Sequence, residues 1–201
     1  MASLEITALD QNPVQQFAAW FDEALTCEAI RYANAVCLAT VDENDRPDGR
    51  IVLLKAFDER GFCFFTNSNS VKGRALARRP HAAMTFYWDP LERQVRIQGT
   101  VEQVSAAEAD EYFASRPRGS QLGAWASEQS RPLESREALE ERVTEFTRQF
   151  EGRPVERHAH WNGYRLCPSK IEFWQAAQFR LHDRFEYRKD GASWAITRLY
   201  P

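Results

Sequence analysis

Short runs rich in β-branched and aromatic residues, separated by turn signals such as Asp190-Gly191, make up most of the chain from Ala35 onwards. Helices stand between only some of these runs, so the order is not the βαβα alternation of a doubly wound sheet. The pattern predicts a mostly β, α+β architecture, in which a small antiparallel barrel carries peripheral helices. The predicted strands cover residues 35–41, 50–57, 61–66, 81–88, 92–104, 163–167, 170–175, 184–189 and 193–199.

Capping signals place the predicted helices. Asn12 and Pro13 are typical of a helix start, and apolar residues then recur at helical spacing, which predicts an amphipathic helix over 13–30. Ser105 and Glu108 form a capping-box pattern that opens a helix to about residue 115. Two further helices are predicted over about 70–78, after Ser70 and before Pro80, and over about 135–150, before Gly152.

Composition limits the class of protein. With 201 residues, of which 43% are hydrophobic, the chain can bury one core, so we expect a single domain over 1–201 with residues 1–12 flexible. The net charge of −3 is too small for a dedicated nucleic-acid surface. No apolar run is long enough to cross a bilayer, and the opening residues lack a signal-peptide pattern.

The cysteines and histidines do not indicate a disulfide or metal protein. Cys27, Cys37, Cys63 and Cys167 have no CxxC spacing, and three of them lie in apolar, strand-like runs. We therefore expect reduced thiols in a cytoplasmic protein. His158 and His160 form an HxH pair without nearby cysteines or carboxylates at ligand spacing, which favours a surface loop over a metal site. The usual Gly-rich nucleotide fingerprints are absent too.

Three basic residues are candidates for anion binding. Arg50 and Lys55 stand at the two ends of the run RIVLLK, which is also typical of a core strand with basic ends. Because side chains alternate along a strand, Arg50 and Lys55 point to opposite faces, so they serve two different anions if both bind one. Lys72 lies at the start of a predicted helix, and it is either part of a phosphate seat or a solvated lysine.

Two further groups combine cations with aromatic residues. Tyr112 and Arg116 share a helix face, with Ser120 close behind, so they either hold a phosphate dianion or form a stacked pair. In RLHDR, a strand geometry projects Arg180, His182 and Arg184 to one side, after the aromatic surface of Trp174. Such a face fits an anionic or electron-rich ligand better than a basic edge strand that discourages aggregation.

Several segments, in order, resemble the pyridoxamine 5′-phosphate oxidase family, which uses FMN. The resemblance extends from about residue 13 to the end, and SRPRGSQLGAWASEQS and RLHDR are its most specific motifs. The matching segments are RIVLLK (50–55), FFTNSNSVKG (64–73), LERQV (91–95), YFASRPRGSQLGAWASEQS (112–130), IEFWQ (171–175), RLHDRF (180–185) and the final RLYP.

The resemblance implies a split β-barrel of the FMN-binding type, forming a homodimer with FMN at the subunit interface. It implies that Arg50 and Lys72 hold the FMN phosphate and that Trp174 lies against the flavin ring system. The full set of cofactor-binding residues that it implies is Arg50, Ile51, Val52, Leu53, Lys55, Phe65, Thr66, Val71, Lys72, Gln94, Gln129, Ser130, Trp174 and Arg184.

The resemblance also implies the reaction. The C4′ amine or alcohol of pyridoxamine or pyridoxine 5′-phosphate is oxidised to the aldehyde pyridoxal 5′-phosphate, and O₂ is reduced to H₂O₂ after a hydride equivalent reaches flavin N5. Arg180 and His182 are implied as catalytic residues that orient the pyridine ring, and no metal is implied. The implied substrate-binding residues are Lys55, Tyr112, Arg116, Ser120, Arg180 and His182.

The sequence departs from the family pattern at a few positions. Val71 stands where an arginine is common, so one contact to the FMN phosphate is missing, and Arg74 is a candidate replacement. Asn162 and Ala176-Ala177 stand where glycines are frequent. Two alternatives stay open: a related flavin oxidase acting on another aromatic substrate, such as a phenazine-type compound, and a non-catalytic flavin- or pyridoxal-phosphate-binding protein.

Overall fold

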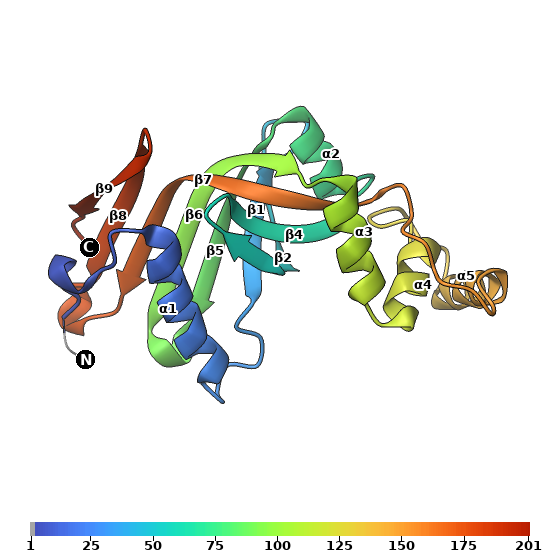
Figure 1. The fold of residues 1–201 in the computed structure, drawn as a ribbon, viewed down its shortest axis with the longest axis horizontal. Coiled ribbons are helices and arrows are strands. Elements are labelled where there is room, and N and C mark those ends of the chain that lie inside the picture. Colours follow the sequence, from blue (N-terminus) through green and yellow to red (C-terminus); the bar gives the residue numbers. More distant parts are fainter. Residues whose placement is uncertain (1–2) are drawn as a thin grey trace.

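A computed structural model describes residues 3–201 and shows a single curled antiparallel sheet of nine strands. The strand order is β2-β1-β5-β6-β7-β4-β3, and β8 and β9 extend the sheet from β7. Helix α1 lies along one face, and helices α3, α4 and α5 gather at one end of the molecule (Figure 1). Within residues 3–201, no helix has the length and apolar character needed to cross a membrane.

The elements follow in chain order. The helices are α1 (Pro13–Thr26), α2 (Val71–Arg78), α3 (Ala106–Ser115), α4 (Arg118–Ala126) and α5 (Arg136–Gln149), with short 3₁₀ turns η1 (Ile6–Ala8), η2 (Asp89–Leu91) and η3 (Gln178–Arg180). The strands are β1 (Ala35–Val41), β2 (Pro47–Leu53), β3 (Ala56–Asp58), β4 (Gly61–Asn67), β5 (His81–Trp88), β6 (Arg93–Gln103), β7 (Trp161–Gln175), β8 (Asp183–Asp190) and β9 (Ser193–Arg198).

Strand β7 is the axis of the sheet. One of its edges pairs with β6, while the other pairs with β4 over residues 161–166 and with β8 over residues 170–175. Pro168 lies between these two halves and has no backbone N–H to donate, which helps to end one pairing before the next begins. The sheet therefore splits at the middle of β7, as a split barrel requires.

Two apolar clusters hold the elements together. The larger one fills the curled sheet, where Phe17 and Trp20 of α1 pack against strand residues such as Phe62 and Phe173. Strand alternation explains the part of this core that β6 supplies, because Val95, Ile97 and Val101 share one face. In β7 the core residues are Tyr164, Leu166, Ile171 and Phe173, and their alternation changes phase at the register shift opposite Gln98 and Gly99. The smaller cluster lies under α3, α4 and α5 and comprises Phe113, Leu122, Phe150, Val155 and Trp161.

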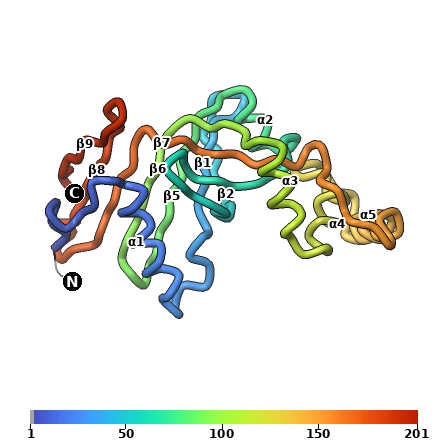
Figure 2. Tube along the Cα trace, in the orientation of Figure 1, coloured from blue at the N-terminus to red at the C-terminus, as the bar shows by residue number. Residues whose placement is uncertain are grey.

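The predicted fold class is confirmed, and so are most strands and helix starts. Asn12 accepts a hydrogen bond from the backbone N–H of Val14, and Ser105 and Glu108 form the complete capping box. The flexibility predicted for residues 1–12 stays a prediction, and residues 1–2 of that segment lie outside the described residues. Within the described part, the Leu4 N–H donates to Asp183, and the Asp10 carbonyl oxygen accepts from the Tyr187 hydroxyl. These residues lie beside the C-terminal strands (Figure 2).

Several boundaries were predicted wrongly. Helix α1 ends at Thr26 rather than residue 30, because the Thr26 hydroxyl bonds to carbonyls of the last turn and Cys27 is extended. The run 50–57 is divided into β2 and β3, with a break at residues 54–55. The runs 163–167 and 170–175 form one strand, β7, and α4 was not predicted.

Candidate functional site

Four of the predicted residues meet near the start of α2. Arg50 comes from β2, Thr66 from β4, Lys72 from the first turn of α2, and Gln129 from the loop after α4. The Lys72 Nζ donates to the Thr66 hydroxyl at 3.4 Å, and Thr66 in turn donates to Gln129 Oε1 at 3.0 Å. We call these four residues the Lys72 cluster.

The charge of the Lys72 cluster is not fully compensated. Lys72 is only 8% exposed, and no carboxylate of residues 3–201 lies within ion-pair distance of its Nζ. Burial lowers the pKa of Lys72, and the nearby Arg50 guanidinium lowers it further. Arg50 itself donates to Thr40 Oγ1 at 2.7 Å and pairs with Asp48. A buried lysine beside a half-buried arginine, with Asp48 as the one carboxylate partner of the arginine among residues 3–201, leaves a position for an anion.

The remaining residues of the predicted phosphate site lie around this cluster. Val52 shares the inward face of β2 with Arg50, whereas Ile51 and Leu53 point outward, and Ile51 is 65% exposed. Val71 is the first residue of α2 and is exposed. Ser130 follows Gln129 with a left-handed backbone. The Arg74 guanidinium donates to the Asn69 carbonyl oxygen and is exposed.

A second group surrounds a stack of three aromatic rings. The rings of Phe65, Tyr112 and Trp161 are stacked, with the Phe65 and Tyr112 centroids 4.1 Å apart. The Arg116 guanidinium lies over the Trp161 ring at 4.9 Å, and the Lys55 Nζ lies 5.9 Å from the Tyr112 ring centroid. We call Lys55, Tyr112, Arg116 and Ser120, with this stack, the Arg116 cluster.

Arg116 is the most informative member of this cluster. Its Nη1 atom is buried and has no hydrogen-bond partner in residues 3–201, and no carboxylate of those residues pairs with it. Burial lowers the pKa of Arg116. A buried donor without a partner is costly, so an anionic group that reaches the guanidinium is strongly favoured. The alternative prediction, a stacked pair of Tyr112 and Arg116, has the wrong partner, because the Arg116 guanidinium lies over the Trp161 ring.

One cavity connects the two clusters. It has a volume of about 370 Å³, and Arg116 and Ser120 line it together with Thr66 and Gln129. Arg50 and Lys55, which the strand period assigned to different anions, belong to different clusters. The geometry thus offers two anion positions that face a common space.

The third predicted group lies on β6, β7 and β8. Gln94 is opposite Trp174, and Trp174 is opposite Arg184, so the three side chains form a row on one face of the sheet. The His182 ring lies 4.7 Å from the Trp174 ring. Arg184 donates to Glu172 and to the Tyr200 carbonyl oxygen. We call Gln94, Trp174, His182 and Arg184 the Trp174 cluster.

The predicted strand geometry of RLHDR is wrong. Gln178–Arg180 forms a 3₁₀ turn, Phe179 and Arg180 have left-handed backbones with φ of 56° and 62°, and β8 begins only at Asp183. Arg180 is therefore exposed in a turn instead of sharing a strand face with His182. The His182 Nδ1 accepts a hydrogen bond from the Ala177 N–H at 3.2 Å, which closes the turn.

The Arg116 and Trp174 clusters lie at opposite ends of β7. Trp161, under Arg116, is the first residue of the strand, and Trp174, beside His182, is its penultimate residue. At about 3.3 Å per residue, the contour between them is roughly 40 Å. Figure 1 shows β7 crossing the molecule between these ends. Within one chain, no small ligand contacts both clusters.

The sequence interpretation missed Trp161. The only signal was its position two residues before the run GYRLC, because alternation puts Trp161, Gly163 and Arg165 on one face of β7. Asn162, on the opposite face, accepts from Arg157 and donates to the Ala159 carbonyl oxygen. Its amide therefore stabilises the loop before β7.

The chain is similar in sequence to a single family over nearly its whole length. Residues 22–150 match a family model described as pyridoxamine 5′-phosphate oxidase, and residues 161–201 match one described as the pyridoxine 5′-phosphate oxidase C-terminal dimerisation region. Pyridoxine/pyridoxamine 5′-phosphate oxidase 1 of Ralstonia nicotianae is 56% identical over 202 residues, covering 100% of this chain and 94% of that protein. The oxidase of Rubrobacter xylanophilus is 52% identical over 200 residues, covering 100% and 92%.

Solved structures share the fold. PhzG from Burkholderia lata, in complex with tetrahydrophenazine-1-carboxylic acid, is 31% identical with a TM-score of 0.92, covering 100% of this chain and 98% of that one. An FMN-binding protein related to pyridoxamine 5′-phosphate oxidase, from Nostoc punctiforme, has a TM-score of 0.75 at 18% identity, covering 96% and 100%. At that identity, the second likeness concerns the fold alone.

Proposed function

Because the chain belongs to the pyridoxamine 5′-phosphate oxidase family, we propose that it is an FMN-dependent oxidase that forms pyridoxal 5′-phosphate from pyridoxamine and pyridoxine 5′-phosphates. O₂ is the electron acceptor, and H₂O₂ is released. The single observation that carries this proposal is the cavity that Thr66 and Gln129 of the Lys72 cluster line together with Arg116 and Ser120. Beside it lie two cations, Lys72 and Arg116, that have no carboxylate partner in residues 3–201. The Lys72 cluster and the Arg116 cluster each fit one phosphate group, and the reaction needs two phosphorylated compounds, FMN and the substrate, side by side.

The Lys72 cluster fits the FMN phosphate. Lys72 and Arg50 supply positive charge, and the hydroxyl of Thr66 and the amide of Gln129 supply neutral hydrogen-bonding groups beside it. Ser130 completes this set, with backbone contributions near Ile51 and Phe65. Gln94, Trp174 and Arg184 form a row on one face of the sheet that suits the flavin ring system. Because this row lies at the far end of β7 from the Lys72 cluster, the row that meets a given FMN belongs to the second protomer.

The Arg116 cluster fits the substrate phosphate. The Nη1 atom of Arg116 has no partner in residues 3–201, and Ser120 lines the same cavity as Arg116. Lys55 and Tyr112 lie together in the neighbouring pocket and add an ammonium and a second hydroxyl. Together these groups can bind a dianion with several charge-assisted hydrogen bonds. In this proposal, the protein therefore binds the substrate mainly through its phosphate.

Arg180 and His182 orient the pyridine ring in this proposal. Since His182 Nδ1 accepts from the Ala177 N–H, a neutral imidazole carries its proton on Nε2 and can donate it to the substrate. Arg180 lies in an exposed turn from which it can reach a ligand outside its own chain. Bound FMN supplies the two-electron acceptor for the oxidation at C4′. The protein contributes position, charge and exclusion of water.

A homodimer completes the site. The two halves of the substrate site are about 40 Å apart along β7, so the Arg180 and His182 of one protomer must act on the substrate held by the Arg116 cluster of the other. The match of residues 161–201 to a dimerisation region supports such an assembly. Exposed Ile51, Leu53 and Tyr87 provide apolar surface for it.

The phenazine-type alternative has one observation in its favour, the similarity to PhzG. The Lys55, Tyr112, Arg116 and Ser120 set favours a phosphorylated substrate instead, because a tricyclic carboxylic acid has no dianion to occupy it. Comparing turnover of pyridoxine 5′-phosphate with turnover of tetrahydrophenazine-1-carboxylic acid, the compound bound in the PhzG structure, decides between them. For the cell compartment we propose the cytoplasm, since all four cysteines are free thiols.

The direct test uses the purified, FMN-loaded protein. Anaerobic addition of pyridoxine 5′-phosphate is expected to bleach the flavin absorbance, and admission of air is expected to restore it with release of pyridoxal 5′-phosphate and H₂O₂. A protein that binds FMN but stays yellow with both phosphorylated substrates is a non-catalytic binding protein. A protein that does not bind FMN at saturating concentration contradicts the proposal altogether.

A further inference from the structure

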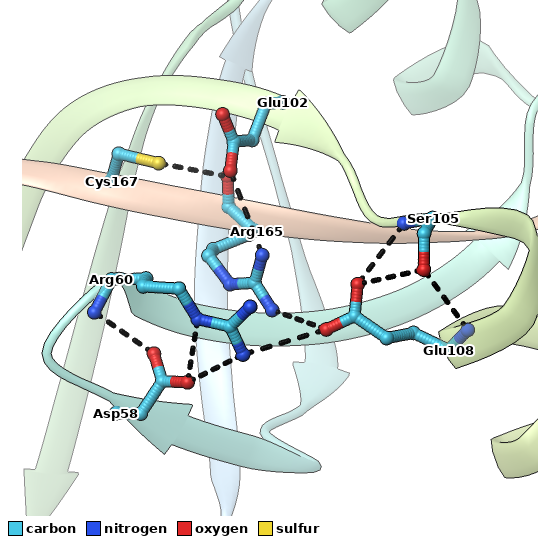
Figure 3. Close-up of polar contacts among 7 residues, drawn as sticks. All are labelled: Asp58, Arg60, Glu102, Ser105, Glu108, Arg165 and Cys167. Atoms are coloured by element: carbon cyan, nitrogen blue, oxygen red, sulfur yellow. Dashed lines mark hydrogen bonds and ion pairs between the residues drawn. The ribbon is translucent and has the colours of Figure 1, made fainter.

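A network of ion pairs joins helix α3 to the sheet beside the Arg116 cluster (Figure 3). The Glu108 carboxylate is at its centre. One oxygen, Oε2, accepts from the backbone N–H and hydroxyl of Ser105, both at 3.1 Å. The other, Oε1, accepts from Arg165 Nη2 at 2.8 Å and from Arg60 Nη2 at 3.5 Å. One side chain thus caps α3 and ties it to β7 and to the β3–β4 hairpin.

Water has little access to the Arg165 side of the Glu108–Arg165 ion pair. The Arg165 side chain is 6% exposed, its Nε has no partner in residues 3–201, and its other carboxylate contact, with Glu102, is longer at 3.6 Å. The Glu108 side chain is 37% exposed, so the cost of breaking this pair falls on Arg165, whose buried charge would keep only the longer contact with Glu102. Glu108 therefore holds α3 at a fixed distance from β7.

Helix geometry carries that constraint to the phosphate site. Glu108, Tyr112 and Arg116 are spaced four residues apart, so they follow one another on one face of α3 and its C-cap. The hairpin that Arg60 belongs to begins directly after Lys55. The network thus joins α3, which carries Tyr112, to the β3–β4 hairpin, which Lys55 directly precedes. The Lys55 Nζ lies 5.9 Å from the centroid of the Tyr112 ring.

We propose that Glu108 is a positioning residue for the substrate phosphate: through Arg165 and Arg60 it sets where α3 presents Tyr112 and Arg116. This inference rests on the proposed function for the identity of the phosphate. Charge alone predicts the opposite effect, since Glu108 is an anion close to a site for an anion, and its removal should tighten phosphate binding. The direction of the change therefore separates positioning from electrostatics.

Glu108→Gln is the informative variant. A glutamine has one oxygen acceptor, so it either caps Ser105 with its N–H₂ group turned towards Arg165 or bonds Arg165 and loses the cap. In the FMN-loaded protein, the dissociation constant for pyridoxal 5′-phosphate is expected to rise about tenfold, because small displacements of positioned groups have large effects. The constant for pyridoxal, which has no phosphate, is expected to be unchanged.

Two matched controls separate positioning from loss of structure. Ser105→Ala removes the cap but keeps the Glu108–Arg165 pair, so it is expected to lower the unfolding temperature and leave the dissociation constant unchanged. Glu111→Gln removes one negative charge from α3, three residues after Glu108. The dissociation constant for pyridoxal 5′-phosphate is expected to be unchanged or slightly lower in this variant.

Two results would overturn the inference. One is an unchanged or smaller dissociation constant for pyridoxal 5′-phosphate in Glu108→Gln. The other is an equal increase in Ser105→Ala. Because binding is measured without turnover, an inactive wild-type protein counts against the proposed function, while the comparison of dissociation constants still decides the role of Glu108.

Discussion

At the scale of single residues, Lys72 and Arg116 have the same property. Lys72 is buried and Arg116 is half-buried, residues 3–201 provide no carboxylate within ion-pair distance of either, and burial lowers the pKa of both. A folded chain gains no stability from such groups, because desolvating a charge without a partner is unfavourable. Their presence is explained when each binds a phosphate from a ligand.

Substitution of Lys72 is expected to change affinity and stability in opposite directions. Lys72→Met should weaken FMN binding by about 1.5–3 kcal/mol, roughly 10- to 100-fold, because one charge-assisted bond is lost. The FMN-free variant should unfold at a higher temperature than the FMN-free wild type, because the uncompensated buried charge is gone. Titration of the flavin and thermal unfolding measure the two effects. Unchanged FMN affinity would remove Lys72 from the site.

At the scale of elements, the sequence predicted what depends on local chemistry. Capping residues located the starts of α1 and α3, and alternation located the strands that have one buried face. The turn at residues 178–182 was missed because RLHDR alternates like a strand, while a backbone contact, Ala177 N–H to His182 Nδ1, decides its shape. Helix α4 was missed because Arg116-Pro117 was taken only as a helix end, and its N-cap residue, Pro117, has no side-chain acceptor of the kind that located α1 and α3.

The pairing of β6 with β7 depends on Gly99. A Cβ at this position would lie 1.9 Å from the Cys167 carbonyl oxygen, next to the register shift between Gln98 and Gly99. Gly99→Ala is expected to lower the free energy of unfolding by about 2–4 kcal/mol. Gly119→Ala in α4, where nothing lies within 4 Å, is the control and is expected to gain up to about 1 kcal/mol. Equal effects in denaturant titration would contradict this packing.

Attachment of α3 to the sheet is expected to depend on pH. The Arg165 guanidinium, together with Ser105, lowers the pKa of Glu108 from 4.5 to about 2 in the folded protein. The stability that this carboxylate contributes is therefore complete above about pH 4.5 and lost as the pH falls towards 2. The unfolding temperatures of wild type and Glu108→Gln should differ at pH 6 and converge in acid. If the difference in unfolding temperature grows in acid instead, the ion pair with Arg165 and the hydrogen bonds from Ser105 do not lower the pKa of Glu108.

At the scale of the whole molecule, β7 determines how the site is built. Local patterns predicted its cations and Tyr112, and the resemblance implied further members such as Thr66 and Gln129, which stay predictions. The sequence could not show that the Arg116 and Trp174 clusters lie about 40 Å apart along one strand. In the proposed function, this separation is the reason why the site requires a second copy of the chain. The exposed turn that carries Arg180 agrees with this requirement.

Complementation between two inactive variants tests the central claim most directly. Arg116→Met and Arg180→Met should each be nearly inactive with pyridoxine 5′-phosphate. Coexpression and random pairing give half mixed dimers, each with one site that lacks both substitutions, so about a quarter of the wild-type activity per site should return. If the mixed dimers are as inactive as the parents, each site is built within one chain, and the account of an interfacial oxidase is wrong.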